Sequence, residues 1–123
     1  MLKPSYAKAH ANTGRLYMDL GRAGEAEAHL STALGYAPGD AATWLLIGEL
    51  HLKEGRTKEA IEELRTATRL NPDMSQAYNS IGIGYERLGM HQEAISAYQS
   101  ALAIDPGHKD ASERLMRLYG TTP

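Results

Sequence analysis

The sequence predicts an all-α fold: a right-handed α-solenoid of three stacked helix-turn-helix repeats, followed by a seventh helix that caps the C-terminal end. Residue types recur at an interval of 34 in three copies, without an insertion or deletion. A fixed period of this length is typical of stacked supersecondary units, because one unit alone cannot bury its apolar face. Val is absent and no useful stretch alternates polar with apolar residues, so no sheet is expected.

Six columns of the repeat hold a single residue type in all three copies. This agreement argues strongly against chance recurrence in a chain that is rich in Ala and Gly. The columns are Gly14, Gly48 and Gly82; Gly21, Gly55 and Gly89; Glu25, Glu59 and Glu93; Ala26, Ala60 and Ala94; Ala33, Ala67 and Ala101; and Pro38, Pro72 and Pro106.

The first repeat is expected at residues 7–40 and has the most polar first helix. His10 and Thr13 stand where the second copy has Trp and Ile. A polar face suits a terminal repeat with no unit stacked before it, since the ends of a repeat array must stay soluble.

The second repeat, residues 41–74, shows the helical pattern most clearly. Its first helix follows Asp40, a good N-cap residue, and has apolar residues at helical spacing from Trp44 onward. Gly55 ends this helix. The second helix ends before Pro72, because the residue that precedes a proline is pushed out of the helical region.

The third repeat, residues 75–108, follows the same pattern. Residues 109–120 then supply only the first helix of a further copy, and a lone helix at this place is expected to cover the last hairpin. We therefore expect residues 1–123 to form a single domain. The apolar face of the capping helix carries Leu115, Leu118 and Tyr119.

The recurring small residues have a packing reason. Gly48 on one helix of the second repeat is matched by Ala60 and Ala67 on the other. Small side chains remove bulk where two antiparallel helices cross, so the helix axes can come close while Trp44 and Leu64 fill the flanking space.

Spacing and residue type together resemble the tetratricopeptide repeat, whose pattern has Trp, Leu, Gly, Tyr, Ala, an aromatic residue, Ala and Pro at the corresponding places. The resemblance spans residues 7–108 in three units, and it departs from the pattern at His51, where Tyr is usual. The matching residues of the second unit are Trp44, Ile47, Gly48, His51, Gly55, Ala60, Leu64, Ala67 and Pro72.

The resemblance implies a protein-protein interaction module, or adaptor, that binds a peptide or helix of a partner protein in a concave groove lined by the first helices of the repeats. Mapped onto this sequence, the partner-binding groove comprises Asn12, Arg15, Asp19, Leu45, Leu46, Glu49, Lys53, Asn79, Ile83, Glu86 and Arg87.

The apolar middle of this groove has two interpretations. Leu45, Leu46 and Leu52 are not needed for the contact within the hairpin. They form either an exposed strip that a partner segment covers, or a buried seam between neighbouring first helices in which only Leu46 is accessible.

One subclass of the family holds the free C-terminal carboxylate of chaperones with a clamp of Lys, Asn and Arg side chains. None of the clamp positions in repeats one to three holds the required residue, and when these positions are shifted by one repeat toward the C-terminus, only Arg114 fits. A carboxylate facing Leu46 and Glu49 would lose its charge-assisted hydrogen bonds, so a chaperone C-terminal tail is not expected as a partner. In the unshifted frame, the clamp positions hold Ala11, Arg15, Leu46, Gln76 and Ser80.

Composition and charge narrow the remaining classes of function. The net charge of −2 and the pI near 6.2 give no basic surplus that would attract nucleic acid. Cys is absent, which excludes disulfides and thiolate metal sites. Neither a secretory signal nor a run long enough to cross a bilayer is visible, so we expect a cytoplasmic protein without membrane insertion.

The sequence does not support catalysis, a cofactor or a metal site, and we expect a protein that is not an enzyme. The five His residues are scattered, and no two of them are four residues apart on a helix face. His51 with Glu54 comes nearest to a ligand pair. The favoured interpretation is that His51 replaces Tyr in the packing of the hairpin seam.

Two classes of function remain open. The chain is either an independent adaptor or an accessory helical docking segment of a larger enzyme or of a secretion or assembly component. A weaker alternative is RNA binding by a related helical repeat, against which the 34-residue period, the Pro column and the lack of basic surplus argue. Self-association through the apolar face of residues 109–120 is compatible with either class.

Overall fold

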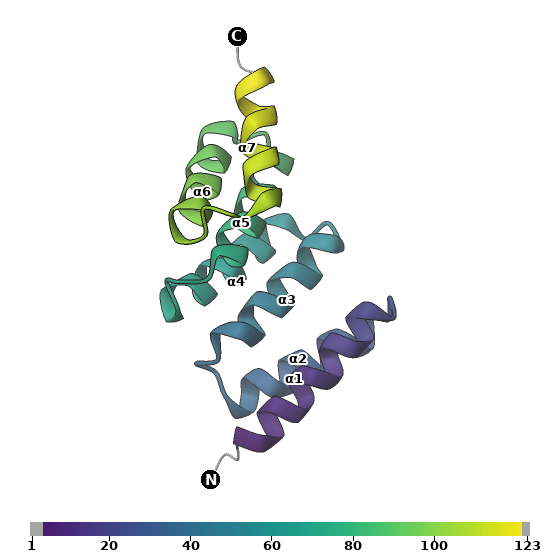
Figure 1. The fold of residues 1–123 in the computed structure, drawn as a ribbon. Helices are drawn as coiled ribbons and strands as arrows, with labels where there is room; N and C mark the ends of the chain where they lie inside the picture. Colours follow the sequence, from purple (N-terminus) through teal and green to yellow (C-terminus); the bar gives the residue numbers. More distant parts are fainter. Residues whose placement is uncertain (1–3, 122–123) are drawn as a thin grey trace.

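The computed structural model describes residues 4–121, which form seven α-helices and no strand. The helices follow one another from α1 at the N-terminal end to α7 at the C-terminal end (Figure 1). This confirms the predicted all-α solenoid; residues 1–3 and 122–123 of the expected domain lie outside the described residues. The helices are α1 (Pro4–Asp19), α2 (Ala23–Tyr36), α3 (Ala41–Lys53), α4 (Thr57–Leu70), α5 (Ser75–Arg87), α6 (His91–Ile104) and α7 (Lys109–Thr121).

Each hairpin turn contains a glycine in the left-handed backbone region. The φ angles of Gly21, Gly55 and Gly89 are 75°, 82° and 74°, values that residues with a Cβ atom rarely adopt. The residue after each glycine donates its N–H to the carbonyl oxygen five residues earlier, at 2.9 Å in all three turns. This Schellman arrangement ends the first helix of each hairpin and explains the glycine column.

A second glycine column lies where the two helices of a hairpin cross. A Cβ atom added to Gly48 would lie 2.7 Å from Leu64 Cγ, and one added to Gly82 would lie 2.5 Å from Tyr98 Cε1. Leu64 and Tyr98 are fully buried. The predicted close contact of the helices therefore exists, and it depends on the absence of a side chain at these positions.

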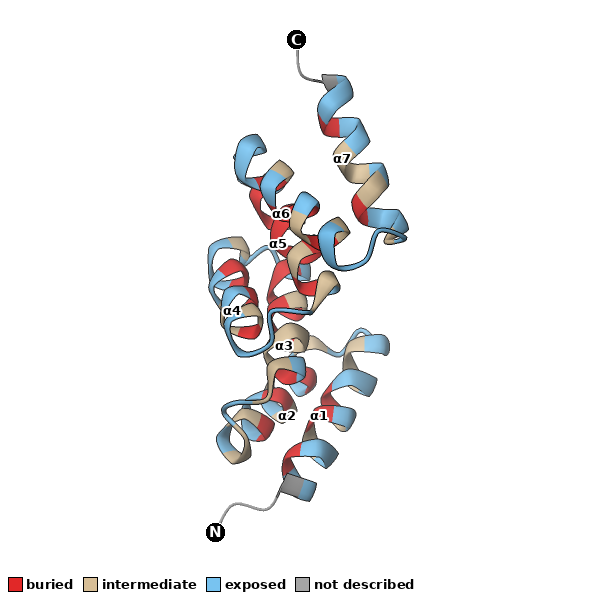
Figure 2. Ribbon diagram, turned by 60° about the vertical axis from the view of Figure 1, so that its left-hand side comes forward, coloured by how far each residue is buried: buried red, intermediate tan, exposed pale blue. Residues whose placement is uncertain are grey.

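The core follows the seams between the helices rather than a single centre, and Figure 2 shows buried residues on the sides of the helices that face one another. One cluster joins α4 to α7 around Tyr98 and Leu64, and a smaller one joins α2 to α3 around Leu30 and Leu50. Each hairpin thus covers part of the next, as a repeat array requires.

The capping helix α7 uses its apolar face to cover α6. Leu118 is only 6% exposed, and Leu115 packs against the same core. The face that we considered for self-association is therefore largely occupied within the chain. Met116 and Tyr119 are exposed.

Asp40 precedes α3, as the sequence predicts. Its carboxylate accepts a hydrogen bond from Thr43 Oγ1 at 2.7 Å, but it makes no side-chain hydrogen bond to a backbone N–H of the helix. Asp40 is therefore the N-cap residue by position, as predicted, and its carboxylate binds the Thr43 hydroxyl rather than a backbone N–H.

None of the helices within residues 4–121 combines the length and the apolarity that a bilayer-spanning segment needs.

Candidate functional site: a concave groove

The first helices of the three hairpins and the capping helix, α1, α3, α5 and α7, line a continuous groove. Three hollows of about 420, 490 and 480 Å³ follow one another along it. Neighbouring hollows share lining residues, so they form one elongated site rather than separate pockets. The shared residues are Glu49, Lys53 and Gln76 at one junction and Arg15, Ala42 and Leu46 at the other.

The middle of the groove has an apolar floor from α3. Leu45 and Leu46 are half-buried and line the middle hollow, whereas Leu52 is 5% exposed. Each of our two interpretations is therefore correct in part: Leu52 belongs to a buried seam, while Leu45 and Leu46 both keep surface that a partner can cover.

The part of the groove between α3, α5 and α7 has a polar floor. Asn79 is 1% exposed and donates its Nδ2–H to Asp110 Oδ2 at 2.8 Å. The carboxylate of Glu49 accepts hydrogen bonds from Gln76 Nε2 at 2.9 Å and from Ser80 Oγ at 3.2 Å. These contacts hold α3, α5 and α7 together beneath the groove.

Hydrogen bonds also engage the acidic side chains at this end. The hydrogen bond from Asn79 holds the pKa of Asp110 below its usual value; burial opposes the shift, and Arg114, whose Nε donates to the same carboxylate at 2.8 Å, reinforces it. Glu86 accepts a hydrogen bond from the Tyr98 hydroxyl at 2.5 Å. Burial, followed by this bond, raises the pKa of Tyr98 well above its usual range. Glu49, Glu86 and Asp110 thus have partners within the chain.

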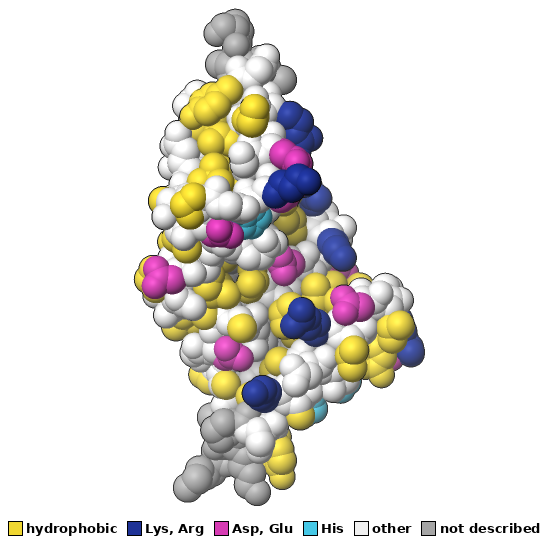
Figure 3. Space-filling view, in the orientation of Figure 1, with side chains coloured by type: hydrophobic (Ala, Val, Ile, Leu, Met, Phe, Trp, Pro, Cys, Tyr) yellow, Lys and Arg dark blue, Asp and Glu magenta, His cyan; other side chains and the backbone are white. Residues whose placement is uncertain are grey.

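Several basic side chains at the rim of the groove make no hydrogen bond or ion pair within the described residues. Lys8, Arg15 and Lys53 are exposed and line the hollows, and they have no hydrogen bond or ion pair to another residue in the stretch 4–121. Arg87 donates one hydrogen bond to the carbonyl oxygen of Leu52. Asp19 is the exposed acid among these rim residues. Hydrophobic surface on this face lies between scattered charged side chains (Figure 3).

The structure brings together all the residues that the resemblance mapped onto the groove, since each of them lines one of the three hollows. Asn79 forms part of the floor rather than a protruding contact. The mapping omitted Asp110 and Arg114 of α7, which lie one period of 34 after Gln76 and Ser80. The shifted clamp frame had already reached Arg114, and applying the same register to the groove lining would have added both residues.

This architecture defines a helical-repeat protein with an elongated binding face. Models of the family described as tetratricopeptide repeat match residues 17–81 and residues 75–108. The first match alone covers more than half of the 123-residue chain. The chain therefore belongs to the tetratricopeptide repeat family, as its repeating columns indicated.

Solved structures with the same fold include three informative neighbours. The crystal structure of MamA is 26% identical, with a TM-score of 0.88 over 96% of this chain and 69% of the MamA chain. The first TPR domain of Spaghetti (RPAP3), bound to the HSP90 peptide SRMEEVD, is 18% identical, with a TM-score of 0.93 over 97% of this chain and 94% of that domain. The TPR domain of Arabidopsis OM64 is 18% identical, with a TM-score of 0.94 over 97% and 98%.

At 18% identity, the likeness to the RPAP3 and OM64 domains shows a common fold and nothing finer. A comparison with curated protein sequences gives no significant match.

Proposed function

We propose that this chain is a protein-interaction module, an adaptor without catalytic activity, that binds a peptide or helix of a partner protein in the groove of α1, α3, α5 and α7. The observation that carries the proposal is the continuity of the three hollows, which suits an elongated segment. Individual small-molecule sites are usually enclosed, and these hollows open into one another.

The groove offers two kinds of interaction to such a segment. Leu45 and Leu46 provide apolar surface, and covering them removes that surface from water. Arg15 and Lys53 flank this surface and have no partner in the described chain, so acidic or carbonyl groups of the segment can pair with them. Rim charges of this kind set orientation and association rate more than affinity.

We do not expect a chaperone C-terminal tail as the partner. Glu49 occupies the centre of the groove, and its carboxylate already accepts hydrogen bonds from Gln76 and Ser80. A C-terminal carboxylate placed there would face like charge. We therefore expect a chaperone tail peptide to show no low-micromolar binding by calorimetry, although the first TPR domain of RPAP3 is bound to an HSP90 peptide. We also propose a cytoplasmic location and a partner that is not nucleic acid.

Affinity capture with matched triple variants tests the proposal. The groove variant combines Leu46→Glu, Lys53→Glu and Arg87→Glu. Its control makes the same three types of substitution on α4, outside the groove: Leu70→Glu, Lys58→Glu and Arg69→Glu.

Partners captured by the wild-type chain should be lost from the groove variant and retained by the control, with both variants folded by circular dichroism. Equal retention by the two variants would place binding elsewhere on the molecule.

A further inference from the structure

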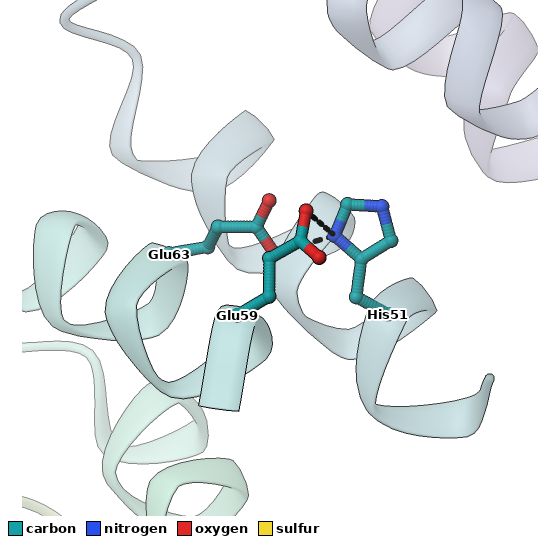
Figure 4. A group of neighbouring side chains, drawn as sticks. All are labelled: His51, Glu59 and Glu63. Atoms are coloured by element: carbon teal, nitrogen blue, oxygen red, sulfur yellow. Dashed lines mark hydrogen bonds and ion pairs between the residues drawn. The ribbon is translucent and has the colours of Figure 1, made fainter. Parts of the chain in front are cut away.

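A cluster of ligand-type side chains lies at the crossing of α3 and α4, outside the groove. His51 is 2% exposed. Its Nδ1 lies 2.6 Å from Glu63 Oε1 and 4.0 Å from Glu59 Oε2, and its Nε2 is hydrogen-bonded to Glu27 of α2. Figure 4 shows the carboxylates of Glu59 and Glu63 converging on the same ring nitrogen. His51 is buried in the hairpin seam at the position of Tyr, as we predicted, but it also forms a polar junction between two hairpins, which the prediction lacked.

We propose that His51, Glu59 and Glu63 bind one Zn²⁺ ion, or a similar first-row transition-metal ion, with Glu27 as the carboxylate that orients the imidazole. One imidazole nitrogen and carboxylate oxygens form a donor set that zinc accepts, whereas magnesium and calcium prefer oxygen ligands alone. Three protein ligands leave a fourth position for water.

The separations between the donor atoms are compatible with one ion. Ligand atoms on a tetrahedral Zn²⁺ ion lie about 3.4 Å apart when each bond is about 2.1 Å long. Nδ1 is closer than this to the Glu63 oxygen and farther than this from the Glu59 oxygen. To share an ion with Nδ1, each carboxylate oxygen has to change its distance from Nδ1 by less than about 1 Å, and the three donor atoms already lie within 4.8 Å of one another.

The contact with Glu27 is the arrangement that zinc-bound histidines require. A metal-ligating imidazole almost always donates its other ring N–H to a carboxylate, carbonyl or water, which fixes the tautomer and the ring orientation. Here Nε2 has this partner in Glu27, so Nδ1 is the nitrogen directed at Glu59 and Glu63. The orienting carboxylate comes from the preceding hairpin, and the ion would therefore stabilise the stacking of the first two repeats.

Arg56 competes with a metal ion for the carboxylate of Glu59. Its guanidinium donates to Glu59 Oε2 at 2.7 Å and to Glu27 Oε1 at 3.0 Å. The same Arg-Glu pair occurs one period earlier, between Arg22 and Glu25, whereas the third repeat has Met90 at the Arg position. Because the Arg56 side chain is 42% exposed, it can leave Glu59 and keep its bond to Glu27.

Only the second repeat combines these ligands in the described chain. One period earlier, the positions of His51 and Glu63 hold Tyr17 and His29, and one period later they hold Tyr85 and Ala97. Among the His, Asp and Glu side chains of residues 4–121, His51, Glu59 and Glu63 form the one group of three or more whose donor atoms all lie within 4.8 Å of one another.

Titration of the chelator-treated protein with ZnCl₂ in a calorimeter tests the site, with CoCl₂ as a spectroscopic probe. We expect one ion per chain, visible absorption typical of low-coordinate Co²⁺, and a rise in the thermal midpoint of about 5 °C or more at saturating zinc. Glu63→Gln should weaken binding at least tenfold and remove the absorption, and Glu27→Gln should weaken it by about 10- to 100-fold.

Two controls separate this site from other imidazoles and carboxylates. Glu62→Gln makes the same charge change one residue away on the exposed side of α4 and should leave the affinity unchanged. His29→Gln removes the close histidine pair of residues 4–121, in which His10 Nδ1 and His29 Nδ1 lie 3.1 Å apart, and should also have no effect.

All variants should keep the helical circular dichroism spectrum. Absence of one-to-one binding would overturn the proposal, and so would binding that survives Glu63→Gln or disappears with His29→Gln.

Discussion

The seams of the first and second hairpins fill equivalent positions with different chemistry. In the first, the rings of Tyr17 and His29 stack with centroids 5.5 Å apart, and His29 stacks on His10 at 5.4 Å. One period of 34 residues later, the positions of Tyr17 and His29 hold His51 and Glu63, which are hydrogen-bonded at 2.6 Å. The same backbone geometry therefore carries an aromatic stack in one repeat and an ionisable network in the next.

The difference follows from what covers each seam. α2 lies over the second hairpin and brings Glu27 to His51. In the described chain no helix covers the corresponding face of the first hairpin, where Leu16 is 63% exposed. Its counterpart one period later, Leu50, is 3% exposed. The constant glycine and alanine columns set the spacing of the helices. The residues at the variable seam positions differ according to the helix that packs against each seam.

The largest expected effect on stability comes from disrupting the close helix crossing that the two hairpins share. Gly48→Leu places a side chain where even a Cβ atom would lie 2.7 Å from Leu64 Cγ. The helices must separate, and the free energy of unfolding should fall by about 3 kcal/mol or more. Urea unfolding measures it. Gly35→Leu is the control, because a Cβ atom there meets nothing within 4 Å; equal loss in both variants would show that the crossing is not close.

The next effect concerns the second seam alone. His51→Ala removes the partner of two carboxylates, of which Glu63 is mostly buried. Unfolding free energy should decrease by about 2 kcal/mol at pH 6, because the carboxylates lose their hydrogen bonds while Glu63 stays out of water. An unchanged urea midpoint would mean that the network adds no stability.

The pH dependence of the same variant sharpens the assignment. Burial lowers the pKa of His51, but the hydrogen bonds that its imidazolium donates to Glu27 and Glu63 outweigh burial, so the pKa is raised. The folded state then binds the proton more tightly than the unfolded state. In chelator, this contribution should be fully present below about pH 6.5 and should be lost as pH rises through the folded pKa. Unfolding curves of the wild type should show the decline, and His51→Ala should lack it.

A smaller effect is expected at the first seam. His29→Ala removes a half-buried ring that stacks between Tyr17 and His10, and it leaves no buried carboxylate without a partner. Aromatic contacts of this kind contribute about 1 kcal/mol. Thermal unfolding of His29→Ala beside His51→Ala gives the comparison directly, and a greater loss in His29→Ala would reverse our ranking of the two seams.

The smallest effect on stability is expected in the groove. Leu46→Glu changes a half-buried side chain at the surface, and the free energy of unfolding should stay within about 0.5 kcal/mol of the wild type. Partner capture should nevertheless be lost, because the substitution places a charge on the apolar floor. A large drop in the urea midpoint would instead assign Leu46 to the core.

The fold was predictable because its determinants act locally and recur. Gly55 ends a helix through its own backbone conformation, and Gly48 faces a residue of the same hairpin. The groove lining was predictable only through the family resemblance, which assigns Leu46 and Lys53 to the inner face of α3; both line the middle hollow.

The His51 network was not predictable in the same way. Glu27 precedes His51 by 24 residues and belongs to another hairpin, and neither helical periodicity nor the spacing of neighbouring residues reveals such a pair. The sequence offered Glu54, three residues away, as the nearest partner of His51, whereas the structure places Glu27 and Glu63 against its ring. Likewise, the hydrogen bond from buried Asn79 to Asp110 of the capping helix exists only once α7 has packed.

Site-specific photocrosslinking tests the central claim most directly. A photoreactive residue replaces Leu46 in the groove or, as the control, Leu70 at the end of α4, and cross-linked segments from the native extract are identified by mass spectrometry. The account predicts that position 46 captures one recurrent partner segment and that position 70 does not. Capture of that segment only at position 70, or at neither position while the intact chain still binds its partner, would contradict it.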